Sequence, residues 1–125
     1  MAKRKVTNLT DVSEITCVVQ KGMADDIVQS LLDAGIQGAT VHSGVGTGIR
    51  ERMGMLGVAV EVEREIVQVL VSKDQVDRIF ERMYLAGRLD TPGMGYIYAA
   101  PLVQAATYIP AHLLEDKDSL SSLGV

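Results

Sequence analysis

The spacing of apolar residues along the chain changes several times, and each change predicts a new secondary-structure element. Residues 15–19 form a short β-branched run, which is typical of a strand. Residues 25–34 then carry apolar side chains at every third or fourth position, which predicts a helix that ends at Gly35. An extended pattern returns at residues 39–43. The first third of the chain therefore predicts a strand, a helix and a strand.

A second long extended segment follows. Between residues 58 and 71, valine and isoleucine alternate with polar residues over most of the length, and this predicts one long strand or two strands with a break near Arg64. The acidic residues Glu61, Glu63 and Glu65 are interpreted as a solvated strand face. Residues 46–57 are rich in glycine and show no period, so they predict a loop.

A second helix and two further strands complete the pattern. Ser72 and Gln75 have the spacing of a capping box, which predicts a helix whose inward positions are apolar and which ends at Gly87. Residues 96–99 predict the next strand and residues 105–109 a last short one. The resulting order is that of an α+β, ferredoxin-like βαββαβ sandwich, an antiparallel sheet with two helices on one face.

The strand before the second helix is apolar on both sides. Ile66 and Leu70 point one way, whereas Val67, Val69 and Val71 point the other way. One layer of helices covers only one of these faces, and soluble proteins seldom expose a large apolar surface. The pattern therefore predicts that another copy of the chain covers the second face.

Composition and charge exclude several classes of protein. The chain has 125 residues, of which 47% are hydrophobic and 22% charged, as expected of one small soluble domain. No apolar run is long enough for membrane insertion, and the basic start at residues 3–5 continues with polar residues, so we expect a cytoplasmic protein. The net charge of −4 disfavours nucleic acid as a partner. Cys17 is interpreted as a core residue, and the few His and Cys residues show no metal-site spacing.

Two glycine-rich segments carry the best indication of function. They are GATVHSGVGTGIR, at residues 38–50, and AGRLDTPGMG, at residues 86–95. Glycine turns allow backbone N–H groups to close around an anion. The first segment lacks the third glycine of a dinucleotide fingerprint, and the chain lacks the Gly-Lys-Ser/Thr of a P-loop. A simpler interpretation is that the glycines lead a strand into a hairpin loop.

These glycine segments, together with EIVQVLVSKDQVDRIF, resemble the PII signal-transduction proteins, the nitrogen regulatory P-II family. The resemblance covers residues 14–110, preceded by an N-terminal extension (1–13) and followed by a C-terminal tail (111–125). It implies a homotrimer that binds adenine nucleotides between subunits. It also implies a T-loop at about residues 46–64 that contacts a target protein, and a B-loop at about residues 87–95.

The resemblance also implies a set of nucleotide-binding positions. They are Thr40, Gly46, Gly48, Arg50, Gln68, Leu70, Gly87, Arg88, Asp90, Thr91, Pro92, Gly93 and Gly95. In the T-loop, Arg52, Met53 and Met55 are candidates for partner contact. Because few buried contacts are expected there, residues 47–56 are predicted to be poorly ordered in the free protein.

The chain departs from the family pattern where the phosphates are expected. Arg50 replaces a glutamine and Gln68 a glutamate, Met94 stands near the place of a phosphate-binding lysine, and residues 102–110 contain no basic residue. Each charge-assisted hydrogen bond contributes roughly 1.5–3 kcal/mol. We therefore expect ADP or AMP to bind at least as tightly as ATP, with a metal ion only alongside ATP.

The resulting prediction is a PII-like regulator of a target protein, either a membrane transporter or a metabolic enzyme. Two other classes stay open: a trimer of the copper-tolerance type that binds no nucleotide, and a small enzyme. An enzyme is disfavoured because no nucleophile and base pair is evident. Replacing Val69 with Asp is predicted to break the trimer.

Overall fold

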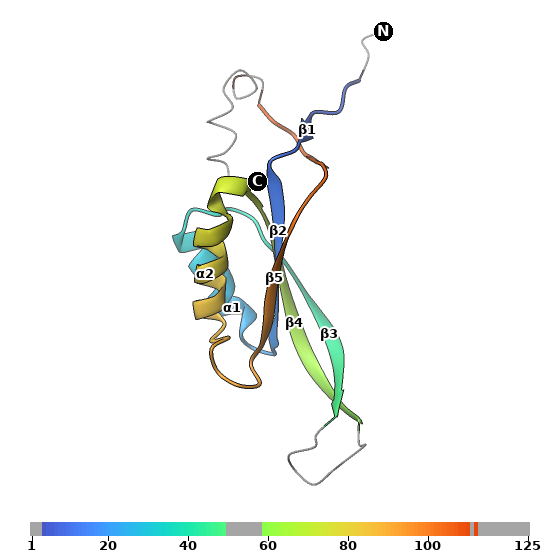
Figure 1. The fold of residues 1–125 in the computed structure, drawn as a ribbon, viewed down its shortest axis with the longest axis vertical. Coiled ribbons are helices and arrows are strands. Elements are labelled where there is room, and N and C mark those ends of the chain that lie inside the picture. The colour runs from blue at the N-terminus through green and yellow to red at the C-terminus, as the bar shows by residue number, and fades with distance from the viewer. Residues whose placement is uncertain (1–3, 50–58, 111, 113–125) are drawn as a thin grey trace.

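The computed structural model describes residues 4–49, 59–110 and 112, and divides them into six strands, two α-helices and a short 3-10 helix. Strands that are neighbours in the sheet are often far apart in the sequence, as Figure 1 shows. The elements are β1 (Asn8–Leu9), β2 (Val12–Gln20), α1 (Ala24–Asp33), β3 (Thr40–Ile49), β4 (Ala59–Ser72), η1 (Lys73–Gln75), α2 (Val76–Ala86), β5 (Gly95–Pro101) and β6 (Ala105–Ala106).

The main sheet has four antiparallel strands in the order β3-β4-β2-β5. Both α-helices pack on the same face of this sheet (Figure 1). This is the ferredoxin-like arrangement that the order of elements predicts. None of the helices in the described ranges is long and apolar enough to cross a membrane.

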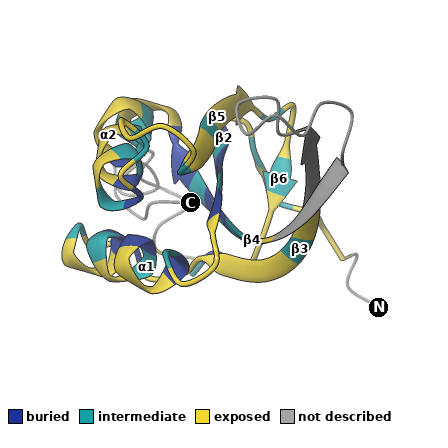
Figure 2. Ribbon diagram, turned by 90° about the horizontal axis from the view of Figure 1, so that it is seen from below, coloured by how far each residue is buried: buried dark blue, intermediate teal, exposed yellow. Residues whose placement is uncertain are grey.

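The core lies between the helices and the face of the sheet that they cover (Figure 2). Alternate residues in the middle of β2 and in the second half of β4 point into it and are buried. The helices contribute Ile27, Leu31, Ile79 and Met83, each at most 1% exposed. The strand residues of this core are Ile15, Cys17, Val19, Val67, Val69 and Val71.

The other face of the sheet carries no helix in the described part of the chain. We call it the uncovered face. The register places on it Glu14, Thr16, Val18 and Gln20 of β2, Thr40, His42 and Gly44 of β3, Arg64, Ile66, Gln68 and Leu70 of β4, and Tyr96, Tyr98 and Ala100 of β5.

β4 is apolar on both sides, as predicted, but Val69 lies on the side that faces the helices. Val69 is 2% exposed and packs in the core against the helices. Ile66 and Leu70 are the apolar residues of β4 on the uncovered face, and both are half-buried. An aspartate at position 69 would therefore disrupt the core, and the predicted contact with another copy would instead involve Ile66 and Leu70.

The hairpin between β3 and β4 is longer than its sequence predicts. β3 continues through the glycines to Ile49, and β4 is one unbroken strand from Ala59. Beyond the pair Gln20 and Arg64, β4 has no further partner in β2, so β3 and β4 continue alone as a two-stranded arm. Residues 46–49 of the predicted loop thus belong to a paired strand, and residues 50–58 lie outside the described ranges.

The second helix begins differently from the prediction. The chain forms one 3-10 turn, η1, before α2 starts at Val76. The Ser72 hydroxyl donates to Asp74 Oδ1 at 2.8 Å, and the Gln75 amide oxygen accepts from Arg78 Nε at 2.8 Å. These two side chains therefore bond to other residues than a reciprocal capping box requires. Gly87 ends α2 as predicted.

Both edges of the main sheet lack charged side chains. The sequence of β5 is GYIYAAP and that of β3 is TVHSGVGTGI, so neither contains Asp, Glu, Lys or Arg. A second, two-stranded sheet joins β1 to β6, with Asn8 opposite Ala106 and Leu9 opposite Ala105. The predicted N-terminal extension thus contains a strand that pairs with the segment after β5.

Candidate functional site

Three of the predicted nucleotide-binding residues come together on the uncovered face. Thr40 opens β3 directly opposite Gln68 on β4, and Leu70 lies two residues further along β4 on the same side. Thr40 is exposed, whereas Gln68 and Leu70 are half-buried. Their common face follows from the period of two along each strand. These residues offer a hydroxyl, an amide and an apolar side chain to a ligand.

Gly46 and Gly48 lie in β3 rather than in a turn. They pair with Val62 and Val60 of β4, and with Gly44 they occupy alternate positions of the strand. Alternate positions share one face, so the glycines leave that face of the arm without side chains on β3. Because β3 is an edge strand, one side of its backbone has no strand partner within the described chain.

The tip of the arm falls outside the described ranges. Arg50, Arg52, Met53 and Met55 all belong to residues 50–58. Their roles in nucleotide or partner binding stay predictions.

The B-loop forms hydrogen bonds to the end of α2 and within itself. Leu89 N–H donates to the Tyr84 carbonyl at 3.0 Å, and Thr91 N–H donates to the Arg88 carbonyl at 3.0 Å. Arg88 itself has φ 55°, an uncommon conformation for a residue with a side chain. Gly93 has φ 85° and its carbonyl accepts from Gln20 Nε2 at 2.9 Å. The side chains of Arg88, Asp90, Thr91 and Pro92 are exposed.

Gly87 and Gly95, at the two ends of the B-loop, both lie close to neighbouring atoms. A Cβ on Gly87 would lie 3.2 Å from the Met83 carbonyl oxygen and 3.3 Å from Ile27 Cδ1. Gly95 has φ 133°, and a Cβ there would lie 1.9 Å from the Val18 carbonyl oxygen. Close backbone approach therefore explains Gly95, whereas a side chain at Gly87 would need its neighbours to shift by a few tenths of an ångström.

The two glycine segments lie on opposite edges of one sheet. β3 is one edge strand and β5, which follows the B-loop, is the other, with β4 and β2 between them. Strands in a sheet are about 4.8 Å apart, so roughly 14 Å separates these edges. The segments of a single chain therefore do not close around one phosphate group, and a cleft that uses both needs a second copy.

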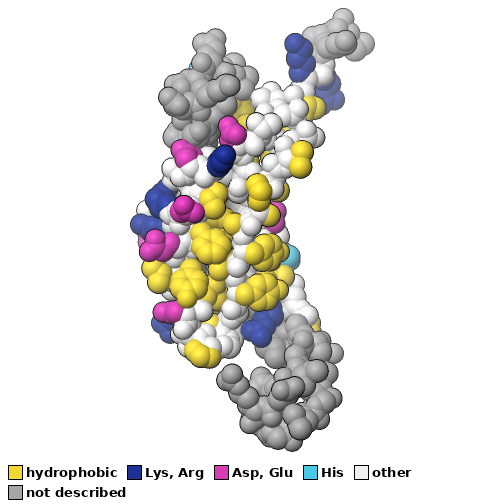
Figure 3. Space-filling model, in the orientation of Figure 1, with side chains coloured by type: hydrophobic (Ala, Val, Ile, Leu, Met, Phe, Trp, Pro, Cys, Tyr) yellow, Lys and Arg dark blue, Asp and Glu magenta, His cyan; other side chains and the backbone are white. Residues whose placement is uncertain are grey.

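Two tyrosines make the β5 edge of the uncovered face aromatic. Tyr96 and Tyr98 are 59% and 47% exposed, and their rings stack with centroids 6.3 Å apart. Figure 3 shows hydrophobic side chains gathered over α2 and β5. Tyr96 directly follows the last glycine of the B-loop, so the aromatic edge begins where the B-loop ends.

Arg64 is a cation of the uncovered face that sequence reasoning did not single out. Its Nη1 is buried and has no hydrogen-bond partner within the described part of the chain. A buried donor without an acceptor is unfavourable, so this guanidinium is suited to an anion. The signal was present in the sequence, because Arg64 lies between Glu63 and Glu65 and must face the opposite way in a strand.

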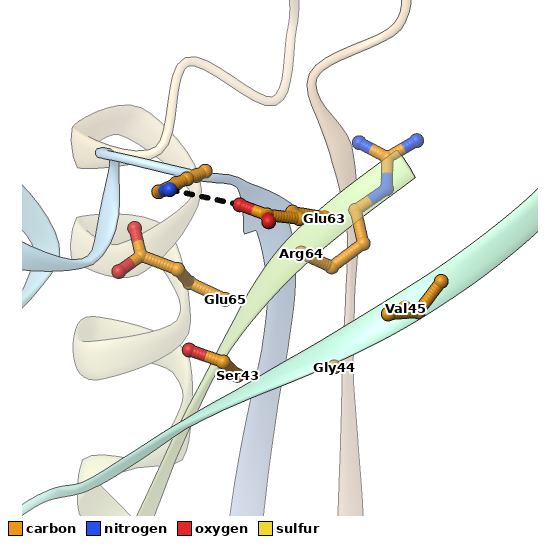
Figure 4. Close-up of a pocket in the computed structure, with 7 residues that line it drawn as sticks. Ser43, Gly44, Val45, Glu63, Arg64 and Glu65 are labelled. Carbon is orange, nitrogen blue, oxygen red and sulfur yellow. Dashed lines mark ion pairs between the residues drawn. The ribbon is translucent and has the colours of Figure 1, made fainter. Parts of the chain in front are cut away.

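A shallow pocket lies at the base of the arm, on the side of the sheet that the helices cover. It has a volume of about 360 Å³ and is lined by Lys21, Ser43, Gly44, Val45, Glu63, Arg64 and Glu65. Lys21 Nζ lies 2.9 Å from Glu63 Oε2 in an exposed ion pair (Figure 4). Their hydrogen bond and mutual attraction lower the pKa of Glu63 and raise the pKa of Lys21. Exposed pairs of this kind are screened by salt.

Glu65 binds the backbone at the start of α1. Its Oε1 accepts hydrogen bonds from Gly22 N–H and from Ala24 N–H, the latter at 3.2 Å. A carboxylate is favourable there, because the first N–H groups of a helix have no partner within the helix. Glu61, Glu63 and Glu65 were predicted to form a solvated strand face. Glu63 and Glu65 instead make specific contacts with Lys21, Gly22 and Ala24. Within residues 4–49, 59–110 and 112, no group of three His, Cys, Asp or Glu side chains could hold a metal ion.

Comparison with known proteins identifies the family. The family model described as nitrogen regulatory protein P-II matches residues 12–110. A structure of Arabidopsis thaliana PII bound to citrate superposes with a TM-score of 0.58 at 22% identity, covering 74% of this chain and 78% of that one. A B. subtilis GlnK-ATP complex gives 0.62 at 21% identity, covering 74% and 82%. A search of curated protein sequences finds no match. The chain belongs to the nitrogen regulatory protein P-II family.

Proposed function

We propose that this protein is a PII-type signal-transduction regulator that binds adenine nucleotides between the subunits of a homotrimer. One geometric observation carries the proposal: the two glycine segments lie on opposite edges of one sheet, while Thr40, Gln68 and Leu70 share its uncovered face. A second copy that covers this face would bring the B-loop of one chain to the β3 edge of the next. The structure of a GlnK-ATP complex, which shares the fold, supports adenine nucleotide as the ligand.

In this proposal, each cleft takes residues from two chains. Thr40, Gln68 and Leu70 of one chain contact the base and sugar, and Gly46 and Gly48 let the phosphates approach the backbone. The neighbouring chain contributes its B-loop, from Arg88 to Gly95. Arg64 adds a guanidinium next to this site and compensates in part for the cations missing from the C-terminal strand. ADP or AMP remains the expected ligand, at least as tightly bound as ATP.

The arm is the proposed output of the protein. Residues 46–64 form the T-loop, with Arg52, Met53 and Met55 as partner contacts, in a domain that spans residues 14–110. The proposed role is to control a transporter or a metabolic enzyme from the cytoplasm. The protein would have no catalytic activity of its own, in keeping with a family of regulatory proteins.

Calorimetry on the intact protein tests the nucleotide site. ATP, ADP and AMP are titrated separately, with and without 2-oxoglutarate and bicarbonate, while light scattering reports the assembly. We expect binding in the micromolar range or tighter, about −8 kcal/mol or more favourable. A stable trimer that binds none of the three nucleotides would support the copper-tolerance type instead.

Gly48→Val is the variant that tests the site, because a branched side chain would occupy the bare face of the arm. Binding should fall while the trimer persists. Gly38→Val is the matched control, because a Cβ at Gly38 would meet no atom within 4 Å. Equal losses in the two variants would contradict a nucleotide site at Gly48.

A further inference from the structure

The two ends of the domain meet in a two-stranded ribbon that is separate from the main sheet. β1 pairs with β6 through two residue pairs, Asn8 with Ala106 and Leu9 with Ala105. We call residues 4–9 and 103–108 together the ribbon. The family model begins at residue 12, so β1 lies before the matched region and β6 lies within it. The ribbon therefore joins a segment from outside the family model to the C-terminal part of the domain.

The ribbon leaves the main sheet from a fixed base. Leu102 N–H donates to the Val12 carbonyl at 2.9 Å, and Lys73 N–H donates to the Asp11 carbonyl at 2.8 Å. Beyond these bonds, β1 and β6 extend past the end of the sheet, on the side away from α1 and α2 (Figures 1 and 2). This is the side on which the proposed homotrimer has another copy of the chain.

The ribbon exposes three large hydrophobic side chains. Val6, Val103 and Tyr108 are 72%, 92% and 84% exposed. Val6 precedes Asn8 by two residues and Tyr108 follows Ala106 by two, so the register of the ribbon places them on one face. A two-stranded ribbon is marginally stable in water, and exposed apolar groups are typical of a contact surface. These side chains need a cover that the described part of one chain does not supply.

The start of the chain is opposite in charge to the remainder. Residues 1–10 contain three basic residues and no acidic residue, whereas residues 11–125 contain nine basic and 16 acidic residues. Arg4 and Lys5 are exposed, and neither forms an ion pair with another described residue. A basic segment on an otherwise acidic chain is complementary in charge to another copy of that chain.

We propose that the ribbon is an inter-subunit contact that packs against the neighbouring copy in the homotrimer. Val6, Val103 and Tyr108 supply its apolar surface, and Arg4 and Lys5 supply attraction to the acidic neighbour. A second copy is the occupant because the ribbon lies on the side of the uncovered face and carries the complementary charge. This inference rests on the assembly in the proposed function. It gives the N-terminal extension the role of holding the subunits together.

Subunit exchange between trimers measures this contact. Unlabelled and isotope-labelled trimers of the full chain are mixed, and native mass spectrometry follows the appearance of mixed trimers. Val103→Ser and Tyr108→Ser should leave the fold unchanged by circular dichroism, because both residues are exposed in the single chain. Each should raise the exchange rate by about tenfold or more, because every interface loses a large apolar contact.

Two further variants define the contact. Leu32→Ser is the matched control, because Leu32 is 52% exposed on α1, in the helix layer on the other side of the sheet, and this variant should exchange at the normal rate. Arg4→Gln combined with Lys5→Gln should raise the exchange rate by about threefold at low salt and have little effect at high salt, since salt screens exposed charges.

Hydrogen exchange provides a second measurement. Ile66→Asp, on the uncovered face, is expected to give a folded monomer. Residues 8–9 and 105–106 should exchange at least about tenfold faster in that monomer than in the unmodified trimer, because the isolated ribbon is marginally stable. The amides of β2 should stay protected in both. A ribbon that packed only on its own chain would be equally protected in monomer and trimer, and that result would overturn the proposal.

The outcomes distinguish this contact from the proposed function. If the unmodified protein is a monomer, the homotrimer fails and the ribbon contact fails with it. If the protein is a trimer that binds nucleotide, but Val103→Ser and Tyr108→Ser exchange subunits no faster than Leu32→Ser, the ribbon contact is overturned and the proposed function stands.

Discussion

Gly95 lies against Val18 so closely that a Cβ on Gly95 would be 1.9 Å from the Val18 carbonyl oxygen. The two residues belong to adjacent strands, where Gly95 opens β5 opposite Val19. The φ of 133° at Gly95 is also one that residues with side chains rarely adopt. This single position therefore controls how the B-loop enters the sheet.

Gly95→Ala should destabilise the protein by about 2–4 kcal/mol, because both the backbone conformation and the contact with Val18 would have to change. Gly38→Ala is the control, since a Cβ there would meet no atom within 4 Å and should change stability by about 0.5 kcal/mol or less. Urea unfolding followed by circular dichroism measures both. Equal stability of the two variants would contradict the tight approach at Gly95.

Ile66→Asp and Val67→Asp should separate assembly from folding. Ile66 lies half-buried on the uncovered face, whereas Val67 is 0% exposed in the core against the helices. An aspartate at position 67 buries an unpaired charge and should unfold the chain. At position 66 it should leave a folded monomer, because the charge is buried only when another copy covers the face. Light scattering measures the assembly and circular dichroism measures the fold. A monomeric unmodified protein would contradict the proposed trimer.

Arg64→Gln should lower the affinity for ATP more than that for AMP. If Arg64 donates to the phosphates, loss of a charge-assisted bond of roughly 1.5–3 kcal/mol weakens ATP binding by about 10- to 100-fold. Calorimetry with each nucleotide measures the difference, with Arg78→Gln, at an exposed position of α2, as the control. Unchanged ATP binding would remove Arg64 from the site. In the unmodified protein, a preference for ATP above about tenfold would show that other cations replace the missing ones.

Cys17 should be inert to thiol reagents in the folded protein. It is 0% exposed, and burial raises the pKa of its thiol from 9.0 to about 11. A pKa raised by folding means that the folded state retains the proton longer, so stability should decrease as the pH rises from about 9 through 11. Alkylation with mass-spectrometric detection should label Cys17 only in denaturant. Rapid labelling under native conditions would contradict its place in the core.

The elements with a strong period were predictable from the sequence. The predicted helix at residues 25–34 corresponds to α1, and the alternation between residues 58 and 71 corresponds to β4 as one strand. The second half of β3 was not predicted, because Gly46 and Gly48 have low strand propensity. Their extended conformation depends on the pairing with β4. β1 was missed because a two-residue strand has no period of its own.

Only those residues of the candidate site that share the uncovered face could be predicted from the sequence. Thr40, Gln68 and Leu70 share the uncovered face because their positions have the same parity in the register of β3 and β4. The contact of Glu65 with Gly22 and Ala24 joins residues more than 40 positions apart, at a turn whose place depends on the register of β2 against β4. The alternation of residues along one strand does not predict a contact between such distant residues.

The absence of charge from both edges of the main sheet bears on how the protein is made in the cell. Charged residues on edge strands normally prevent a newly synthesised chain from adding to foreign strands, and β3 and β5 contain none. A lone chain leaving the ribosome therefore presents two edge strands that no charged side chain protects from pairing with foreign strands.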